Sequence, residues 1–218
     1  VQTQAANPSL KWETTDEVNA GIHFGFLNDK IFGSFDYFTR NTSGILITPP
    51  VAATLGEGQS KAVNGASKSN KGWEFVLGYR GSVGNDLKFN LVSNFAHFRD
   101  EITELPENVR PAYAGNLVNT IIGHSQFDIF GYKTNGLFQS QAEVDAAPKQ
   151  IGAGPGRIRY VDINGDNRID DLDRTWIGTT LPALEYGLRL DLTYKKFDAS
   201  IFGSGVAGRE GFDVYTVF

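Results

Sequence analysis

The sequence predicts an all-β protein that forms part of a large antiparallel transmembrane β-barrel with long external loops. Apolar and polar residues alternate strictly along six segments, and alternation of period two is the mark of a β-strand with two different faces. These segments run to roughly ten residues, the length that a tilted transmembrane strand needs, whereas strands of soluble sheets have about five or six. Two-residue or three-residue turns also alternate with far longer connections, as in outer-membrane barrels.

The six segments pair into three hairpins. Asn28 and Asp29 join the first pair, Gly84 to Asp86 the second, and Lys195 and Lys196 the third. Short turns rich in Asn, Asp and Gly are typical of β-hairpins. The predicted strands cover residues 18–26, 31–38, 73–79, 87–95, 184–194 and 197–203. The long connections cover residues 41–71, 99–125 and 134–182.

The two faces of these segments differ in charge. One face carries apolar residues and no charge, and the other carries every charged residue of the strands: Asp36, Glu74, Lys88, Glu185, Arg189, Asp191 and Asp198. Aromatic residues gather at the turn ends of the strands, where a membrane-interface girdle is expected: Phe24, Phe26, Phe32, Tyr194 and Phe197. A soluble β-sandwich also alternates, but a compact soluble domain rarely carries three connections of this length.

Composition excludes several classes of protein and of site. The net charge is −5 and no basic stripe is visible, so we expect no nucleic-acid partner. The chain has no cysteine, so it forms neither disulfides nor thiolate metal sites. The three histidines, His23, His97 and His124, are scattered near no nucleophile pattern and are expected to be polar surface. No pair of carboxylates suggests acid–base chemistry, so we expect no enzyme activity.

Two local patterns lie outside the strands. Ser140 precedes a stretch with Glu143 at the third helical position, which predicts a short capped helix within 140–150 that ends at Pro148. The glycine pattern of residues 203–208 resembles a dinucleotide fingerprint. That fingerprint needs a following helix, which the sequence does not predict here.

The segment "DINGDNRIDDLD", residues 162–173, is the densest acidic stretch of the chain. Counted from Asp162, side-chain oxygens fall at positions 1, 3, 5, 9 and 12, with a backbone carbonyl at position 7, which is the spacing of a calcium loop. The predicted ligands are Asp162, Asn164, Asp166, Arg168 (through its carbonyl), Asp170 and Asp173. Asn167 replaces the usual glycine, and Asp173 replaces the usual bidentate glutamate. The alternative is an Asx-rich turn whose side chains bond their own backbone.

Four stretches together resemble the barrel of SusC/RagA-type TonB-dependent outer-membrane transporters. They are "NPSLKWE" (7–13), "GYKTNGLFQSQAEV" (131–144), "PGRIRYVDINGDNRIDDLDRTWIGTTLPALEYGL" (155–188) and "FDASIFGSGVAGREGFDVY" (197–215). The resemblance covers nearly the whole chain, and residues 131–188 are its most specific part.

This resemblance implies a closed barrel of about 22 strands around an N-terminal plug, in the bacterial outer membrane. It also implies a SusD-like surface lipoprotein as partner, energy coupling through TonB, and oligosaccharide or peptide substrates. Residues 1–218 would form part of the barrel, without the plug, the TonB box, a signal peptide or the final strands. An open sheet edge cannot face lipid, so we expect a longer protein.

Within that family, residues 134–182 would form a long external loop. The acidic loop at 162–173 would stiffen it, with calcium in a structural role. The runner-up interpretation is a secreted β-sandwich binding module with a dockerin-like calcium loop.

Overall fold

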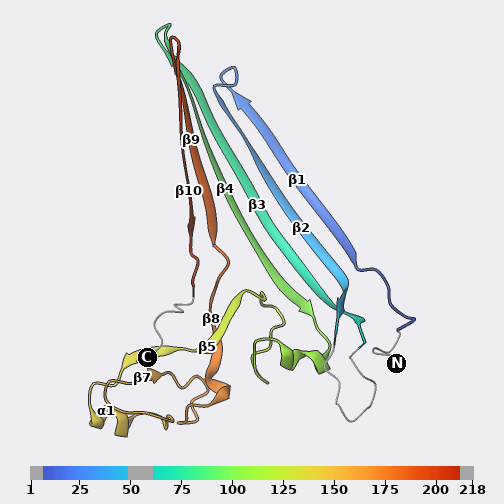
Figure 1. Ribbon diagram of the computed structural model, residues 1–218, viewed down its shortest axis with the longest axis vertical. Helices are drawn as coiled ribbons and strands as arrows, with labels where there is room; N and C mark the ends of the chain where they lie inside the picture. The colour runs from blue at the N-terminus through green and yellow to red at the C-terminus, as the bar shows by residue number, and fades with distance from the viewer. Residues whose placement is uncertain (1–6, 49–60, 212–218) are drawn as a thin grey trace, which may run out of the picture. The chain divides into compact units, whose positions relative to one another are not determined.

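The computed structural model describes residues 7–48 and 61–211. Six strands form one sheet in the order β1-β2-β3-β4-β9-β10 (Figure 1). They are β1 (Thr14–Phe26), β2 (Ile31–Ile47), β3 (Val63–Val83), β4 (Leu87–Glu104), β9 (Leu184–Tyr194) and β10 (Phe197–Ala207). The pairs β1–β2, β4–β9 and β9–β10 are antiparallel. All six predicted strands and their pairing into three hairpins are therefore confirmed.

The strands are longer than their sequence patterns suggested. β2 has 17 residues and β3 has 21. The added part of β3 includes Ser67, Lys68, Ser69 and Asn70, which are polar on both faces, so alternation could not reveal it. Backbone hydrogen bonds extend a ladder even where side chains carry no pattern. The predicted connections 41–71 and 99–125 therefore include residues that belong to β2, β3 and β4. Residues 49–60 lie outside the described residues.

The chain divides into two compact units. The sheet unit comprises Trp12–Ile45, Ser67–Glu101 and Leu181–Phe218, and the loop unit comprises Val1–Lys11, Leu46–Ala66 and Ile102–Thr180. The loop unit has two small antiparallel sheets, β5 (Asp128–Tyr132) with β8 (Arg174–Thr179) and β6 (Thr134–Leu137) with β7 (Ile158–Tyr160). Its short helices are η2 (Glu107–Ala112), α1 (Gln141–Ala146) and η3 (Asp171–Asp173). Among the described residues, no helix is long and apolar enough to cross a membrane.

The strand register keeps the two faces of the sheet apart. Leu91, Leu190 and Ile201 stand opposite one another on the apolar face, across β4, β9 and β10. One residue further along, Asn90, Asp191 and Ser200 form a polar row on the charged face. A slip of one residue would move every side chain to the other face, so this register specifies the pattern.

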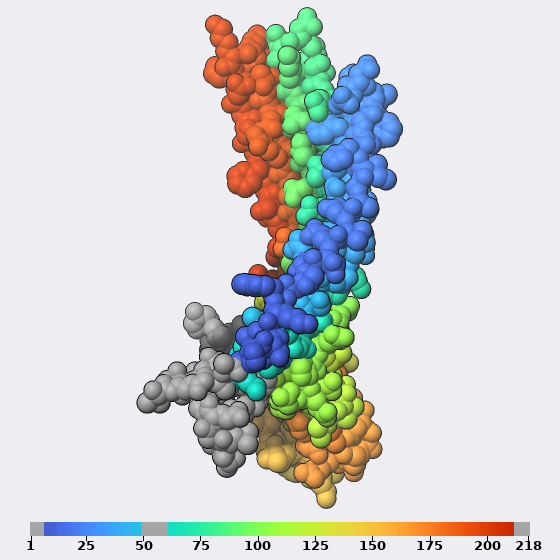
Figure 2. Space-filling view, turned by 90° about the vertical axis from the view of Figure 1, so that its right-hand side faces the viewer, coloured from blue at the N-terminus to red at the C-terminus, as the bar shows by residue number. Residues whose placement is uncertain are grey.

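The apolar face is uncovered within the sheet unit. Ile22 is 67% exposed and Ile201 is 66% exposed. Figure 2 shows the side chains of β1, in blue, standing along one edge of the sheet. Exposed apolar area costs about 25 cal/mol per Å² in water, so a continuous face of such residues calls for apolar surroundings.

Glycines opposite aromatic rings explain why the sequence is rich in both. A Cβ on Gly72 would lie 2.6 Å from the ring of Phe38, and a Cβ on Gly81 would lie 2.7 Å from the ring of Phe89. No real side chain tolerates so close an approach. The rings therefore lie over strand backbone that only glycine leaves open, as when an aromatic covers a glycine in a designed sheet.

Aromatic residues form two rows on the apolar face. Near the turns, the rings of Tyr79 and Phe89 are 5.5 Å apart, and those of Phe24 and Phe26 are 5.7 Å apart. The prediction that Phe32 belongs to this girdle is wrong. It lies on the charged face, where the Arg80 guanidinium stands 4.2 Å from its ring centroid.

The second aromatic row lies further from the turns and was not predicted. Trp73 is 6.5 Å from Phe35 and 6.2 Å from His97, ring to ring, across β2, β3 and β4. Trp73 and Tyr79 are six residues apart on β3, which is about 20 Å at about 3.3 Å per residue. Strands of outer-membrane barrels tilt by about 35–45°, so the two rows lie about 15 Å apart along the membrane normal, within the apolar band of about 25 Å.

We predict that charge is tolerated on one face only. Leu190→Arg should destabilise the full-length protein by about 2–4 kcal/mol, because mid-strand Leu190 would carry its charge into the bilayer centre. Glu74→Arg, on the charged face of β3, should cost far less. Reversible unfolding in lipid vesicles measures both, and equal losses would contradict the two-face assignment.

Candidate functional site

The loop unit is built around a few buried apolar side chains. Phe138 is 1% exposed and Ile121 is 2% exposed. The backbone of Phe138 bonds that of Arg157 and of Gly156, at 2.9 and 2.7 Å, and so joins the end of β6 to the turn before β7. This core fixes the frame from which the acidic loop projects.

Helix α1 begins as the sequence predicted and ends earlier than Pro148. The Ser140 side chain accepts a hydrogen bond from the backbone N–H of Glu143 at 3.3 Å. The Glu143 carboxylate accepts from the backbone N–H of Gln139 at 2.9 Å, one residue before the cap. The helix spans Gln141–Ala146, because Ala147 already has an extended backbone.

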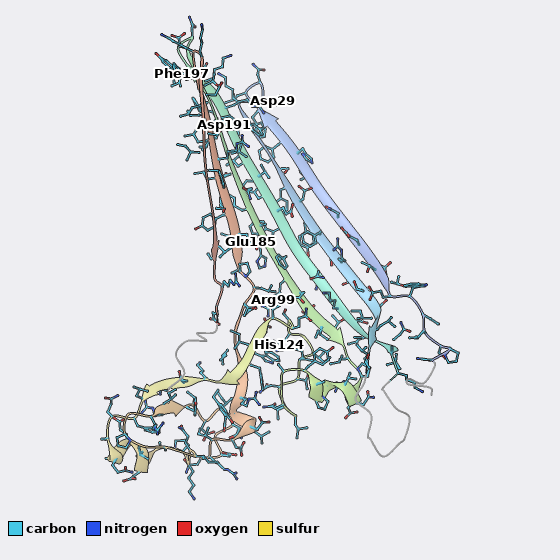
Figure 3. All side chains as sticks on the ribbon, viewed as in Figure 1. Asp29, Arg99, His124, Glu185, Asp191 and Phe197 are labelled. Atoms are coloured by element: carbon cyan, nitrogen blue, oxygen red, sulfur yellow. The ribbon has the colours of Figure 1, made fainter. Side chains whose placement is uncertain are left out.

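An aromatic stack ties the segment before β5 to β8. The ring of His124 lies parallel to that of Trp176, with centroids 4.1 Å apart, and Phe130 packs against the same indole at 5.0 Å. Figure 3 labels His124, whose Nδ1 is 3.3 Å from the carboxylate of Asp128. The prediction that His124 is only polar surface is therefore wrong. Its partners are distant in sequence, so no local pattern revealed the stack.

The first half of the acidic loop is held by side chains that accept from its own backbone. Asp162 accepts from the N–H groups of Gly165 and Asn167, at 2.7 and 2.8 Å. Asn164 accepts from the N–H of Asp166, and Asp166 accepts from that of Arg168, both at 2.9 Å. Asn167 has a φ of 65°, the left-handed conformation that Asn tolerates better than most residues.

The second half of the loop is organised by the fully buried Asp173. Its two carboxylate oxygens accept from the N–H groups of Ile163 and Asp170, each at 2.8 Å. Asp170 in turn accepts from the N–H of Leu172 at 2.9 Å and caps η3. Burial alone would raise the pKa of Asp173, but the backbone hydrogen bonds from Asp170, Ile163 and Asn164 outweigh it and lower that pKa.

Two other segments clamp the loop from outside. The N–H of Ile169 donates to the Lys149 carbonyl at 2.9 Å, and Ile169 is buried, as expected for the apolar anchor of such a loop. Asn116 Nδ2 donates to the Asp171 carbonyl at 2.7 Å, and Asn119 Nδ2 donates to the Arg174 carbonyl at 3.1 Å. Sequence reasoning missed Asn116 and Asn119, which lie about fifty positions upstream and show no motif.

The predicted calcium ligands are close in space but face backbone amides. Calcium needs six or more oxygens converging at about 2.3–2.6 Å. Within residues 7–48 and 61–211, no group of three or more His, Asp or Glu side chains is placed to hold a metal ion. Hydrogen bonds alone account for the described order of the loop, as in the alternative of an Asx-rich turn. Calcium binding therefore stays a prediction.

Taken together, the loop unit presents a scaffold. The stack on Trp176, the clamped acidic loop and the buried Asp173 hold irregular backbone in one arrangement without long secondary structure. Such scaffolds suit the display of a binding surface.

Comparisons with known proteins agree with this architecture. The model of the family described as "TonB dependent receptor-like, beta-barrel" matches residues 1–202. The chain is 27% identical over 219 residues to TonB-dependent receptor P3 of Formosa agariphila. The aligned residues make up 96% of this chain and 22% of that relative. It is 30% identical over 204 residues to TonB-dependent receptor SusC of Bacteroides thetaiotaomicron. This alignment covers 90% of this chain and 20% of SusC.

Solved structures show the same fold. The RagAB peptide importer in its open-open state matches with a TM-score of 0.72 and 22% identity, over 95% of this chain and 22% of that chain. The RagAB peptide transporter matches with a TM-score of 0.69 and 22% identity, over 94% of this chain and 22% of that chain. The chain thus spans about a fifth of the length of these relatives.

We predict that the order of the acidic loop depends on the charge of Asp173. Because the folded-state pKa lies below the ordinary value of 3.8, the ionised carboxylate stabilises the loop above that pH, and this contribution is lost as the pH falls through the lowered pKa. Asp173→Asn should cost about 2–3 kcal/mol of local stability at neutral pH, because a charged acceptor of backbone amides is removed.

Hydrogen exchange of residues 155–180 in the full-length protein measures this stability. The control is Asp171→Asn, whose exposed ion pair with Arg174 is expected to contribute little. Unchanged protection in Asp173→Asn would contradict a central role for this carboxylate.

The calcium prediction is checked by calorimetric titration of the full-length protein after chelation. Calcium should then give a saturable heat signal, because the carboxylates would turn from backbone amides toward the ion. Asp166→Ala should abolish this signal, since it removes a central ligand, while leaving the barrel folded. No signal in the unmodified protein would leave the loop a hydrogen-bonded turn.

Proposed function

The chain belongs to the TonB-dependent receptor-like β-barrel family of the outer membrane, and we propose that it is part of an importer of oligosaccharides or peptides. Transport would draw energy through TonB and involve a SusD-like surface lipoprotein. The observation that carries the proposal is the six-stranded sheet with one exposed apolar face and one charged face. A barrel wall needs these two faces, since lipid lies outside it and water inside.

Chain topology supports an assignment of sides. The turns after β1, β3 and β9 span residues 27–30, 84–86 and 195–196, and they share one end of the antiparallel sheet. The connections from β2 to β3 and from β4 to β9 leave from the opposite end. Outer-membrane barrels have short periplasmic turns and long external loops, so we place the connection from β4 to β9, with its acidic loop, outside the cell.

The names of the relatives support the proposed partner and cargo class. One relative is the TonB-dependent receptor SusC, and the similar solved structures are of a peptide transporter, RagAB. A SusD-like lipoprotein would dock on the external loops, where the clamped acidic loop offers a rigid surface. We propose no enzyme activity, because neither the sequence nor the described part of the loop unit suggests a nucleophile with a base.

The β-sandwich interpretation is less favourable. A sandwich buries its apolar face under a second sheet of similar size. In the described part of the chain, the two other sheets have two strands each. A bilayer is therefore the better match for the apolar face.

The function is tested by uptake in cells that express the full-length protein. Labelled neutral oligosaccharides and labelled oligopeptides are offered to cells with and without TonB. We expect energy-dependent uptake of one class, lost without TonB, because passage of the plug needs external work. Surface labelling of Ile151→Cys, a 95% exposed position in the proposed external loop, controls for insertion. TonB-independent uptake, or none of either class, would contradict the proposal.

A further inference from the structure

Three asparagines of the chain precede a glycine: Asn64, Asn135 and Asn164. All three lie in the loop unit. In an Asn-Gly pair the glycine nitrogen can attack the asparagine side chain, because glycine has no Cβ to shield that nitrogen. The attack is slow where hydrogen bonds fix the side chain or where the nitrogen keeps its proton. The three pairs differ in both respects.

Hydrogen bonds hold the side chains of Asn64 and Asn164. The oxygen of the Asn64 side chain accepts from the N–H of Lys11 at 2.8 Å, and its amide donates to the Lys11 carbonyl at 2.7 Å. The Asn164 amide donates to the carboxylate of Asp166 at 3.2 Å, while its oxygen accepts from the backbone N–H of the same residue. Neither side chain is free to turn toward the following nitrogen.

Asn135 lies in a β-bulge. Between the paired positions Thr134–Tyr160 and Leu137–Ile158, β6 has one residue more than β7. The extra residue of a bulge is not held by the ladder, so the backbone there bends more easily than in a regular strand. Within residues 7–48 and 61–211, no hydrogen bond of the Asn135 side chain is found. Its amide can therefore rotate toward the nitrogen that follows it.

The charges beside the two peptide nitrogens are opposite. The N–H of Gly165 donates to the Asp162 carboxylate at 2.7 Å, and that negative charge opposes loss of the proton. At the other pair, Arg159 Nε donates to the backbone carbonyl of Asn135 at 3.1 Å. Peptide resonance shares the charge of a deprotonated Gly136 nitrogen with this oxygen, so the guanidinium stabilises the anion.

We propose that Asn135 is a deamidation site and that Arg159 promotes the reaction. The Gly136 nitrogen loses its proton to water and attacks Cγ of Asn135. A C–N bond forms, the bond from Cγ to Nδ2 breaks, and ammonia leaves with a proton returned by water. A second water then hydrolyses the succinimide at either carbonyl, which gives aspartate or isoaspartate. The reaction needs only water and does not depend on the proposed transport function.

The product would change one small hollow of the loop unit. Asn135, Arg159, Glu143 and Asp162 are among the residues that line this space of about 450 Å³. The two carboxylates accept from backbone amides elsewhere, which leaves the guanidinium as the charged group in contact with the reacting peptide. Deamidation adds a third carboxylate to the hollow, and isoaspartate also adds a methylene to the backbone of β6.

The test follows the three asparagines in the unmodified full-length protein. Purified protein in detergent is incubated at mildly alkaline pH in water labelled with heavy oxygen, digested in ordinary water and analysed by mass spectrometry. The label enters when a succinimide is hydrolysed, so it reports deamidation during the incubation. Asn135 should react at least about tenfold faster than Asn64 and Asn164, a modest difference in barrier height. Equal rates at the three sites, or no reaction at Asn135, would overturn the proposal.

The part played by Arg159 is measured with Arg159→Gln, and Arg157→Gln is the control. The control removes the same charge two residues away and keeps the hydrogen bond to Asn135. Arg159→Gln should slow labelling of Asn135 about tenfold, because a neutral donor stabilises the anion less than a charged one. The control should leave the rate unchanged. Unchanged or faster labelling in Arg159→Gln, or equal slowing in both variants, would show that Arg159 does not promote the reaction.

Discussion

The sheet depends on one constraint, which is that every backbone N–H and C=O in a bilayer must find a partner within the protein. The ladder between β1 and β2 pairs thirteen residues of β1 without a break, from Thr14 to Phe26. Once that ladder is set, side chains can only alternate between lipid and water. The exposed apolar face, the polar row of Asn90, Asp191 and Ser200, and the close approach of rings to glycines all follow from it.

In the loop unit, side chains rather than a strand ladder satisfy the backbone hydrogen bonds. Its backbone is irregular, so side chains provide the acceptors that a ladder would provide elsewhere. Asp162 accepts two backbone amides and Asp173 accepts three. Asn116 and Asn119 donate to carbonyls from outside the loop. The loop tolerates several negative charges in one short stretch because its carboxylates accept hydrogen bonds from nearby donors. The acidic composition therefore serves order first, whether or not an ion adds to it.

The charged face links the fold to the proposed transport function. A barrel wall exposes its inner side chains along the path of the cargo, so small residues there create space and large ones obstruct it. On β2, rings cover the strand backbone of the neighbouring β3, since Phe38 lies over Gly72. The aromatic–glycine contacts thus stiffen this part of the wall.

The sequence by itself determined the strands, their pairing into hairpins, the two faces, the helix cap at Ser140 and the composition of the acidic loop. These features depend on neighbours one to four positions apart, which local patterns record. Only the tertiary structure decided the strand ends, the contact of Phe32 with Arg80, the stack of His124 on Trp176, and the clamp from Asn116 and Asn119. Each of these depends on partners brought together from distant parts of the chain, and single-chain periodicity carries no information about such partners.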